Sequence, residues 1–204
     1  MVMMFMVHPV ARWFWVVVFL AGLGTASAHS GYENETAVRL HADRMDVVVR
    51  TTFGFAWKIL GHRAPGDIGE AAQQIAKPLL TAEAPGLFEV TAGGTAMDPR
   101  STDCVFELDE HVVFLLTYER PQAWPLVLKA RFFDFFDPMT YGDIALFDQT
   151  DDPYRRDVEP VAADKIYRGK PAFTHDPALA AKVETVPAAV PAAPRPETVK
   201  PPGY

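Results

Sequence analysis

Two neighbouring segments, residues 36–41 and 45–53, alternate apolar and polar side chains, and this alternation constrains the fold more than any other feature of the chain. In the first segment, Val38 and Leu40 alternate with polar or charged neighbours. Successive side chains of a β-strand point to opposite faces, so each segment presents one apolar and one polar face. The polar residues 42–44 between them predict a turn. The two segments are therefore expected to form an antiparallel hairpin with one face on the core.

The second half of the chain repeats this strand chemistry. Further strands are predicted at 87–92, 95–97, 102–108, 111–119, 126–133 and 143–147. Gly93-Gly94 is typical of a two-residue hairpin turn, and Asp109-Glu110 predicts another. The segment 111–119 is apolar on both faces in its middle, which predicts a central strand covered on both sides.

A helical insertion is predicted at about residues 55–84. Apolar residues recur there at helical spacing and would form one buried face: Ile68, Ala71, Ala72, Ile75, Ala76, Leu79 and Leu80. About eight short strands with one such insertion favour a mainly β fold, an immunoglobulin-like β-sandwich over residues 29–169. An α+β roll is the alternative. The aromatic cluster at 132–147 is expected to fill the core.

The first 28 residues read as a signal peptide. Arg12 precedes an apolar run of about eleven residues, and Ala26 and Ala28 form an A-x-A cleavage site. An uncleaved anchor that begins in the apolar residues before Arg12 is the alternative. No later segment is long and apolar enough to span a membrane, so the mature chain is expected to be periplasmic or secreted. Residues 170–204 are rich in Pro and Ala and are predicted to be a disordered tail.

The net charge limits the possible binding partners, and the cysteine content limits the possible cysteine chemistry. Removing Arg12 leaves 18 Lys and Arg against 26 Asp and Glu, a net charge of −8. Nucleic-acid binding requires a basic surface, so nucleic acid is excluded as a partner. Cys104 is the sole cysteine, which excludes an internal disulfide. Its strand alternation with Phe106 and Leu108 predicts a buried thiol rather than a nucleophile.

The known catalytic sequence motifs are missing, since no Gly-rich phosphate loop, H-E-x-x-H, C-x-x-C or G-x-S-x-G occurs. The acidic pairs at 109–110 and 151–152 are expected in solvated turns. The chain is therefore predicted to be non-enzymatic.

Cleavage after Ala28 would leave His29 with a free α-amine beside its imidazole Nδ1. Together these two nitrogens can chelate a metal ion. A further imidazole would complete a site that suits copper or nickel. His62 is the favoured second ligand, because it follows the second strand of the hairpin. The other candidates are weaker: His41 lies at the far end of the first strand, His111 begins a later strand, and His175 falls in the predicted tail. In the alternative, His29 only marks where the peptidase cuts.

The Ala28-His29 junction, the hairpin, the Ala-rich insertion and the segment FEVTAGGTAMDP at 88–99 together carry a family resemblance. They resemble the extracytoplasmic N-terminal domains of hydrogenase/urease-accessory nickel permease-like proteins, and related exported proteins of unknown function. That resemblance covers about residues 29–150 and implies a metal role that can attach only to His29. The family continues into several membrane helices, whereas this chain continues into the Pro/Ala segment. Its recurrent early acidic and His motifs are also not reproduced cleanly.

These observations predict an exported, non-enzymatic binding domain of the cell envelope that handles copper or nickel through His29. A metal-free structural or interaction module with an envelope protein partner is the first alternative. A copper-dependent oxidase or monooxygenase built on the same site is the second.

Overall fold

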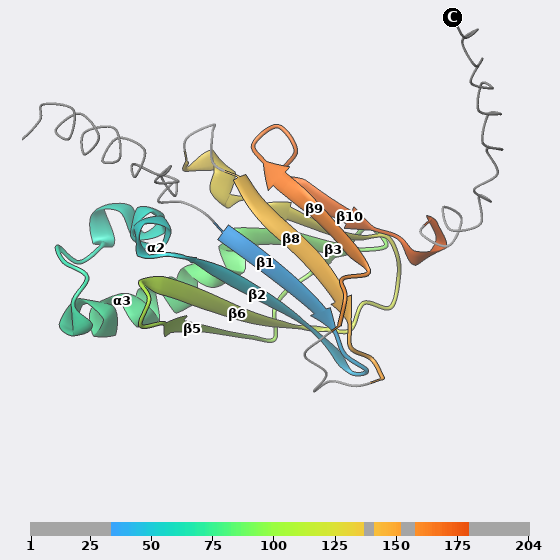
Figure 1. The fold of residues 1–204 in the computed structure, drawn as a ribbon, viewed down its shortest axis with the longest axis horizontal. Helices are drawn as coiled ribbons and strands as arrows, with labels where there is room; N and C mark the ends of the chain where they lie inside the picture. Colours follow the sequence, from blue (N-terminus) through green and yellow to red (C-terminus); the bar gives the residue numbers. More distant parts are fainter. Residues whose placement is uncertain (1–33, 137–140, 152–157, 180–204) are drawn as a thin grey trace, which may run out of the picture.

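The computed structural model describes residues 34–136, 141–151 and 158–179 of the chain, and these residues form two β-sheets with short helices at one end (Figure 1). The six-stranded sheet contains, in spatial order, β5 (Ser101–Phe106), β6 (His111–Glu119), β2 (Arg44–Thr52), β1 (Asn34–Leu40), β8 (Tyr141–Asp148) and β9 (Ala162–Tyr167). The four-stranded sheet contains β10 (Ala172–His175), β7 (Leu126–Ala130), β3 (Phe88–Ala92) and β4 (Thr95–Met97). The predicted mainly β class is confirmed.

The predicted hairpin is confirmed as β1 and β2, which pair antiparallel from Asn34 opposite Thr51 to Leu40 opposite Met45. Strand β1 also pairs with β8, and this is a parallel contact, unlike the other pairings of the two sheets. A parallel pair needs a crossover connection. The long segment between β2 and β8 supplies it and contains the helices, β5 and β6 of the same sheet, and three strands of the second sheet.

One hydrophobic core is shared by the two sheets and the helices. Phe55 lies at its centre and packs on Phe132 and Phe136, with ring centroids 5.1 and 4.5 Å away. The predicted core role of the aromatic cluster is confirmed for Phe132, Phe133 and Phe136, which are buried. It is wrong for Phe135, which is 65% exposed, and for Tyr141, which is 41% exposed on the outer sheet face.

The predicted helical insertion is confirmed, but its buried face is not the predicted one. It consists of α2 (Phe53–Leu60), η1 (Gly61–Arg63), α3 (Glu70–Glu83) and η2 (Ala84–Leu87). Helix α3 buries only Ala72, Ala76 and Leu80, whereas Ile75 is 61% exposed. These three buried residues are spaced by four and form a narrow stripe along the helix, and this stripe packs against β5 and η2. The wider face predicted from apolar spacing therefore turns partly to solvent.

Strand β6 differs from its prediction as a central strand covered on both sides. It is second from the edge, between β5 and β2. Val112, Phe114 and Leu116 face the core and are buried, but Leu115 on the other face is 37% exposed. Nothing among the described residues covers that outer face, which continues across β2, β1, β8 and β9.

The folded chain extends past residue 169, where the sequence analysis placed its end. Strand β10 occupies Ala172–His175 and pairs with β7, so this part of the predicted tail belongs to the core. Phe173 within it is buried. The signal peptide, His29 and residues 180–204 lie outside the described residues. Within the described ranges, no helix has the length and apolar character needed to cross a membrane.

Candidate functional site

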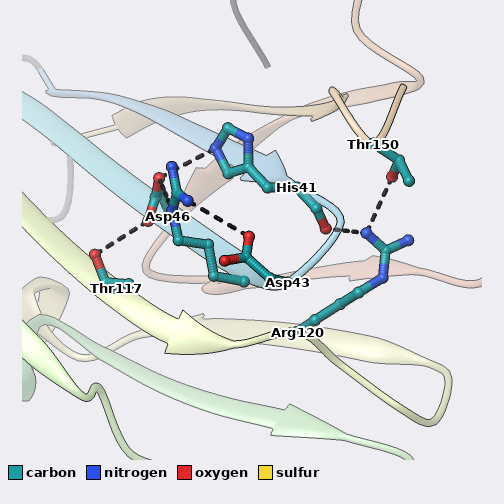
Figure 2. Close-up of polar contacts among 7 residues, drawn as sticks. His41, Asp43, Asp46, Thr117, Arg120 and Thr150 are labelled. Atoms are coloured by element: carbon teal, nitrogen blue, oxygen red, sulfur yellow. Dashed lines mark hydrogen bonds and ion pairs between the residues drawn. The ribbon is translucent and has the colours of Figure 1, made fainter. Parts of the chain in front are cut away.

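His41 is a buried residue that braces the turn between β1 and β2 (Figure 2). Its Nε2 lies 3.1 Å from Oδ2 of Asp46. The same carboxylate receives hydrogen bonds from Arg44 Nε at 3.1 Å and from the Thr117 hydroxyl at 3.0 Å. The His41 carbonyl in turn accepts a hydrogen bond from Arg120. This imidazole is therefore engaged in holding the hairpin end.

The position of His41 also separates it from His29. Strand β1 has seven residues, and at about 3.3 Å per residue it spans about 23 Å. His29 precedes Asn34 by five residues, and five extended residues reach at most about 17 Å. Even a chain folded back along β1 would fall short of the turn. His41 is thus poorly placed to share a metal with His29.

His62 and His175 are the two other described histidines outside β6, and their surroundings differ. His62 lies exposed in η1, separated from β2 by the eight-residue helix α2. No hydrogen bond or ion pair joins its side chain to another described residue. His175 is buried in β10, where its ring meets Trp124 edge-on with centroids 5.5 Å apart. Burial lowers the pKa of His175, which suits a neutral core imidazole.

A cluster of ligand-type side chains lies at the turn between β5 and β6. Atoms of Glu107, Asp109 and His111 that can bind a metal all lie within 4.8 Å of one another. The tight turn places them together, since Glu110 adopts a positive φ of 64° and the Glu107 amide donates to the His111 carbonyl. Sequence reasoning assigned the acidic pair to a solvated turn and ranked His111 low. The signal it missed was the i, i+2, i+4 spacing across a hairpin turn.

His111 is oriented within this cluster by its own turn. Its Nδ1 lies 2.9 Å from the Asp109 carbonyl oxygen and 3.1 Å from Asp109 Oδ1. A carbonyl can only accept, so Nδ1 carries the proton in that hydrogen bond. The tautomer protonated at Nδ1 leaves Nε2 as the basic nitrogen. Metal-binding histidines are commonly fixed in this way, through a hydrogen bond from the other ring nitrogen.

Arg50 of β2 neutralises the two carboxylates. Its Nε lies 2.8 Å from Glu107 Oε2, and its Nη2 lies 2.5 Å from Asp109 Oδ2. The hydrogen bond to Glu107 contributes most to raising the pKa of Arg50. Desolvation would raise the pKa of Asp109, but the hydrogen bond from His111 and the charges of His111 and Arg50 together lower it. The two carboxylates of the cluster are therefore already paired with a positive charge, the guanidinium of Arg50.

The cluster lies at the end of the sheet where the chain enters β1. Thr52 pairs with His111, and its neighbour Thr51 pairs with Asn34. Strands are spaced about 4.8 Å apart, so His111 is about 10 Å across the sheet from the start of β1. This is within the reach of about 17 Å available to His29. His111 is thus better placed for a joint site than its sequence position indicated.

Cys104 is fully buried on the core face of β5, as predicted. Burial raises the pKa of its thiol to about 12, so the nucleophilic thiolate is not populated at neutral pH. Its predicted neighbour Phe106 is half-buried on the same face, but Leu108 lies beyond the strand and is exposed.

Comparison of the chain with models of known protein families and with curated proteins gives no match.

Proposed function

We propose that this chain is an exported, non-enzymatic binding domain of the cell envelope that binds copper or nickel at the β5–β6 turn. In this proposal His29 supplies its α-amine and ring nitrogen after cleavage, and His111 supplies the further imidazole. The observation that carries it is the grouping of Glu107, Asp109 and His111 within 4.8 Å, at the sheet end where the chain enters β1. Amine and imidazole nitrogens are the donors that copper(II) and nickel(II) prefer. The family resemblance to nickel permease-like domains is part of the same proposal, as is an immunoglobulin-like arrangement of the two sheets.

The first test is the mature N-terminus, determined by mass spectrometry of the secreted protein. A start at His29 is expected. A mature chain that begins at any other residue lacks the chelating amine, and the His29 site would then be abandoned.

The second test is copper(II) titration of the secreted protein, followed by electron paramagnetic resonance. His29→Ala and His111→Gln are each expected to weaken binding at least about tenfold and to remove nitrogen hyperfine structure. His62→Gln is the matched control, since His62 is an exposed histidine outside the cluster. Loss of binding in His62→Gln but not in His111→Gln would move the second ligand to His62. Unchanged spectra in His29→Ala would overturn the proposal.

Arg50→Met tests whether the carboxylates take part. Arg50 competes with a metal ion for Glu107 and Asp109, because like charges repel within a few ångströms. Removing its charge is therefore expected to tighten copper binding. Unchanged affinity would mean that neither carboxylate contributes.

A metal-free interaction module is the second candidate. Arg50 satisfies both carboxylates without a metal, and the outer face of the six-stranded sheet is uncovered by described residues. Absence of copper and nickel binding by a chain that begins at His29 would favour this function.

A further inference from the structure

The uncovered face of the six-stranded sheet contains an open trough of about 620 Å³. Its floor is a row of three alanines, Ala37 of β1, Ala145 of β8 and Ala163 of β9, which the strand pairing places side by side. Because alanine side chains are short, larger neighbours on both sides form the walls. Phe147 and Arg39 form one wall, and the other is charged: Glu35, Arg50, Asp143 and Lys165. We call this feature the outer trough.

The two walls differ in how their charges are satisfied. Lys165 lies 3.3 Å from Asp143, so these two charges of the second wall pair with each other. The Arg39 side chain is exposed and has no hydrogen bond or ion pair within the described part of the chain. An occupant with small apolar side chains and a nearby carboxylate would therefore complement the outer trough.

The size of this face also allows a second copy of the chain as a competing occupant. Six strands of six to nine residues, about 4.8 Å apart and rising about 3.3 Å per residue, present about 700 Å². A face-to-face pair would bury about 1,400 Å², within the roughly 1,200–2,000 Å² typical of stable specific interfaces, so the experimental test must distinguish the two occupants. A tethered segment needs less contact area, since a flexible link gives it an effective concentration in the millimolar range.

The chain itself carries such a segment in the 25 residues at 180–204. Residues 186–193 read Val-Pro-Ala-Ala twice, so their side chains are all small and apolar. One acidic and one basic residue flank them on each side: Lys182 and Glu184 before, Arg195 and Glu197 after. The segment follows β10 in the chain, and β10 lies beside β9 (Figure 1). Strand β9 supplies Ala163 to the floor of the outer trough. An extended Pro-rich chain covers about 3.1 Å per residue, so the segment is long enough to reach the outer trough from the end of β10.

We propose that residues 186–193 bind in the outer trough of the same chain, over Ala37, Ala145 and Ala163, with a flanking glutamate on Arg39. Short apolar side chains fit the alanine floor, and a proline-rich segment loses little conformational entropy when it is ordered. The bound segment covers the exposed apolar face.

A spin label on Ala189→Cys in the full secreted chain tests the proposal. Buried Cys104 does not compete for the label, because its thiol is protonated and inaccessible. The amide signals of Ala37 and Ala145 are expected to broaden, and that of Thr91 on the other sheet is expected to stay sharp. Equal signals at all three positions in the labelled and reduced samples would overturn the proposal.

Two variants and a mixing experiment complete the test. Ala145→Arg, and the more exposed Ala163→Arg, place a bulky charge on the floor and are expected to abolish the broadening. Ala96→Arg on β4 is the matched control, because Ala96 is an exposed alanine of the other sheet. Broadening that arises only between labelled and unlabelled copies would assign the outer trough to a second copy and refute intramolecular binding.

Discussion

Replacing Leu80 with alanine removes the largest side chain that α3 buries. Leu80 is 0% exposed, and the other two residues of the buried stripe, Ala72 and Ala76, are already small. Leucine-to-alanine substitutions at fully buried sites cost about 2–5 kcal/mol, as lost transfer energy plus the cavity left behind. We expect about 3 kcal/mol here. For a domain of this size that lowers Tm by roughly 6–12 °C.

Ile75→Ala is the matched control on the same helix. Ile75 is 61% exposed, so its truncation is expected to change the free energy of unfolding by no more than about 0.5 kcal/mol. Urea denaturation monitored by circular dichroism measures both variants. If Ile75→Ala costs as much as Leu80→Ala, α3 is rotated relative to the described structure. The face predicted from apolar spacing would then be the buried one.

Three further predictions concern single sites. Cys104 is expected to resist thiol reagents at pH 8 in the folded protein and to react after unfolding, which a mass-shift assay detects; rapid native labelling would contradict its burial. The pKa of Asp109 is lowered in the folded state, so its contribution to stability is present above the ordinary carboxyl pKa and is lost as pH falls through the folded value. Wild type is thus expected to lose more stability than Asp109→Asn below about pH 4, and parallel pH–stability curves would refute this. Gly142→Ala places a Cβ in steric overlap with the Asn34 side chain and is expected to lower the free energy of unfolding by about 1–3 kcal/mol, as measured by thermal unfolding. Asn34→Gly in the same chain should recover part of that loss.

The candidate site was only partly accessible to sequence reasoning. The histidines could be identified, and their separation from His29 along the chain could rank them as candidate second metal ligands. Spacing could not show that Arg50 of β2 binds Glu107 and Asp109, residues more than fifty positions away. The Arg50 contacts depend on which strands become neighbours, and strand order is not written in local periodicity. Spacing also did not show that His41 is buried beside Asp46, because that contact depends on where the two side chains lie at the hairpin turn.

The sequence by itself determined the mainly β class, the β1–β2 hairpin, the helical insertion and the burial of Cys104. These follow from side-chain alternation and spacing, which act over a few residues. Only the tertiary structure decided that β1 pairs in parallel with β8, that β10 joins the core, and that Leu115 faces an uncovered surface. The physical reason is that an apolar face becomes buried only when another element packs on it. The availability of that element is a property of the whole fold.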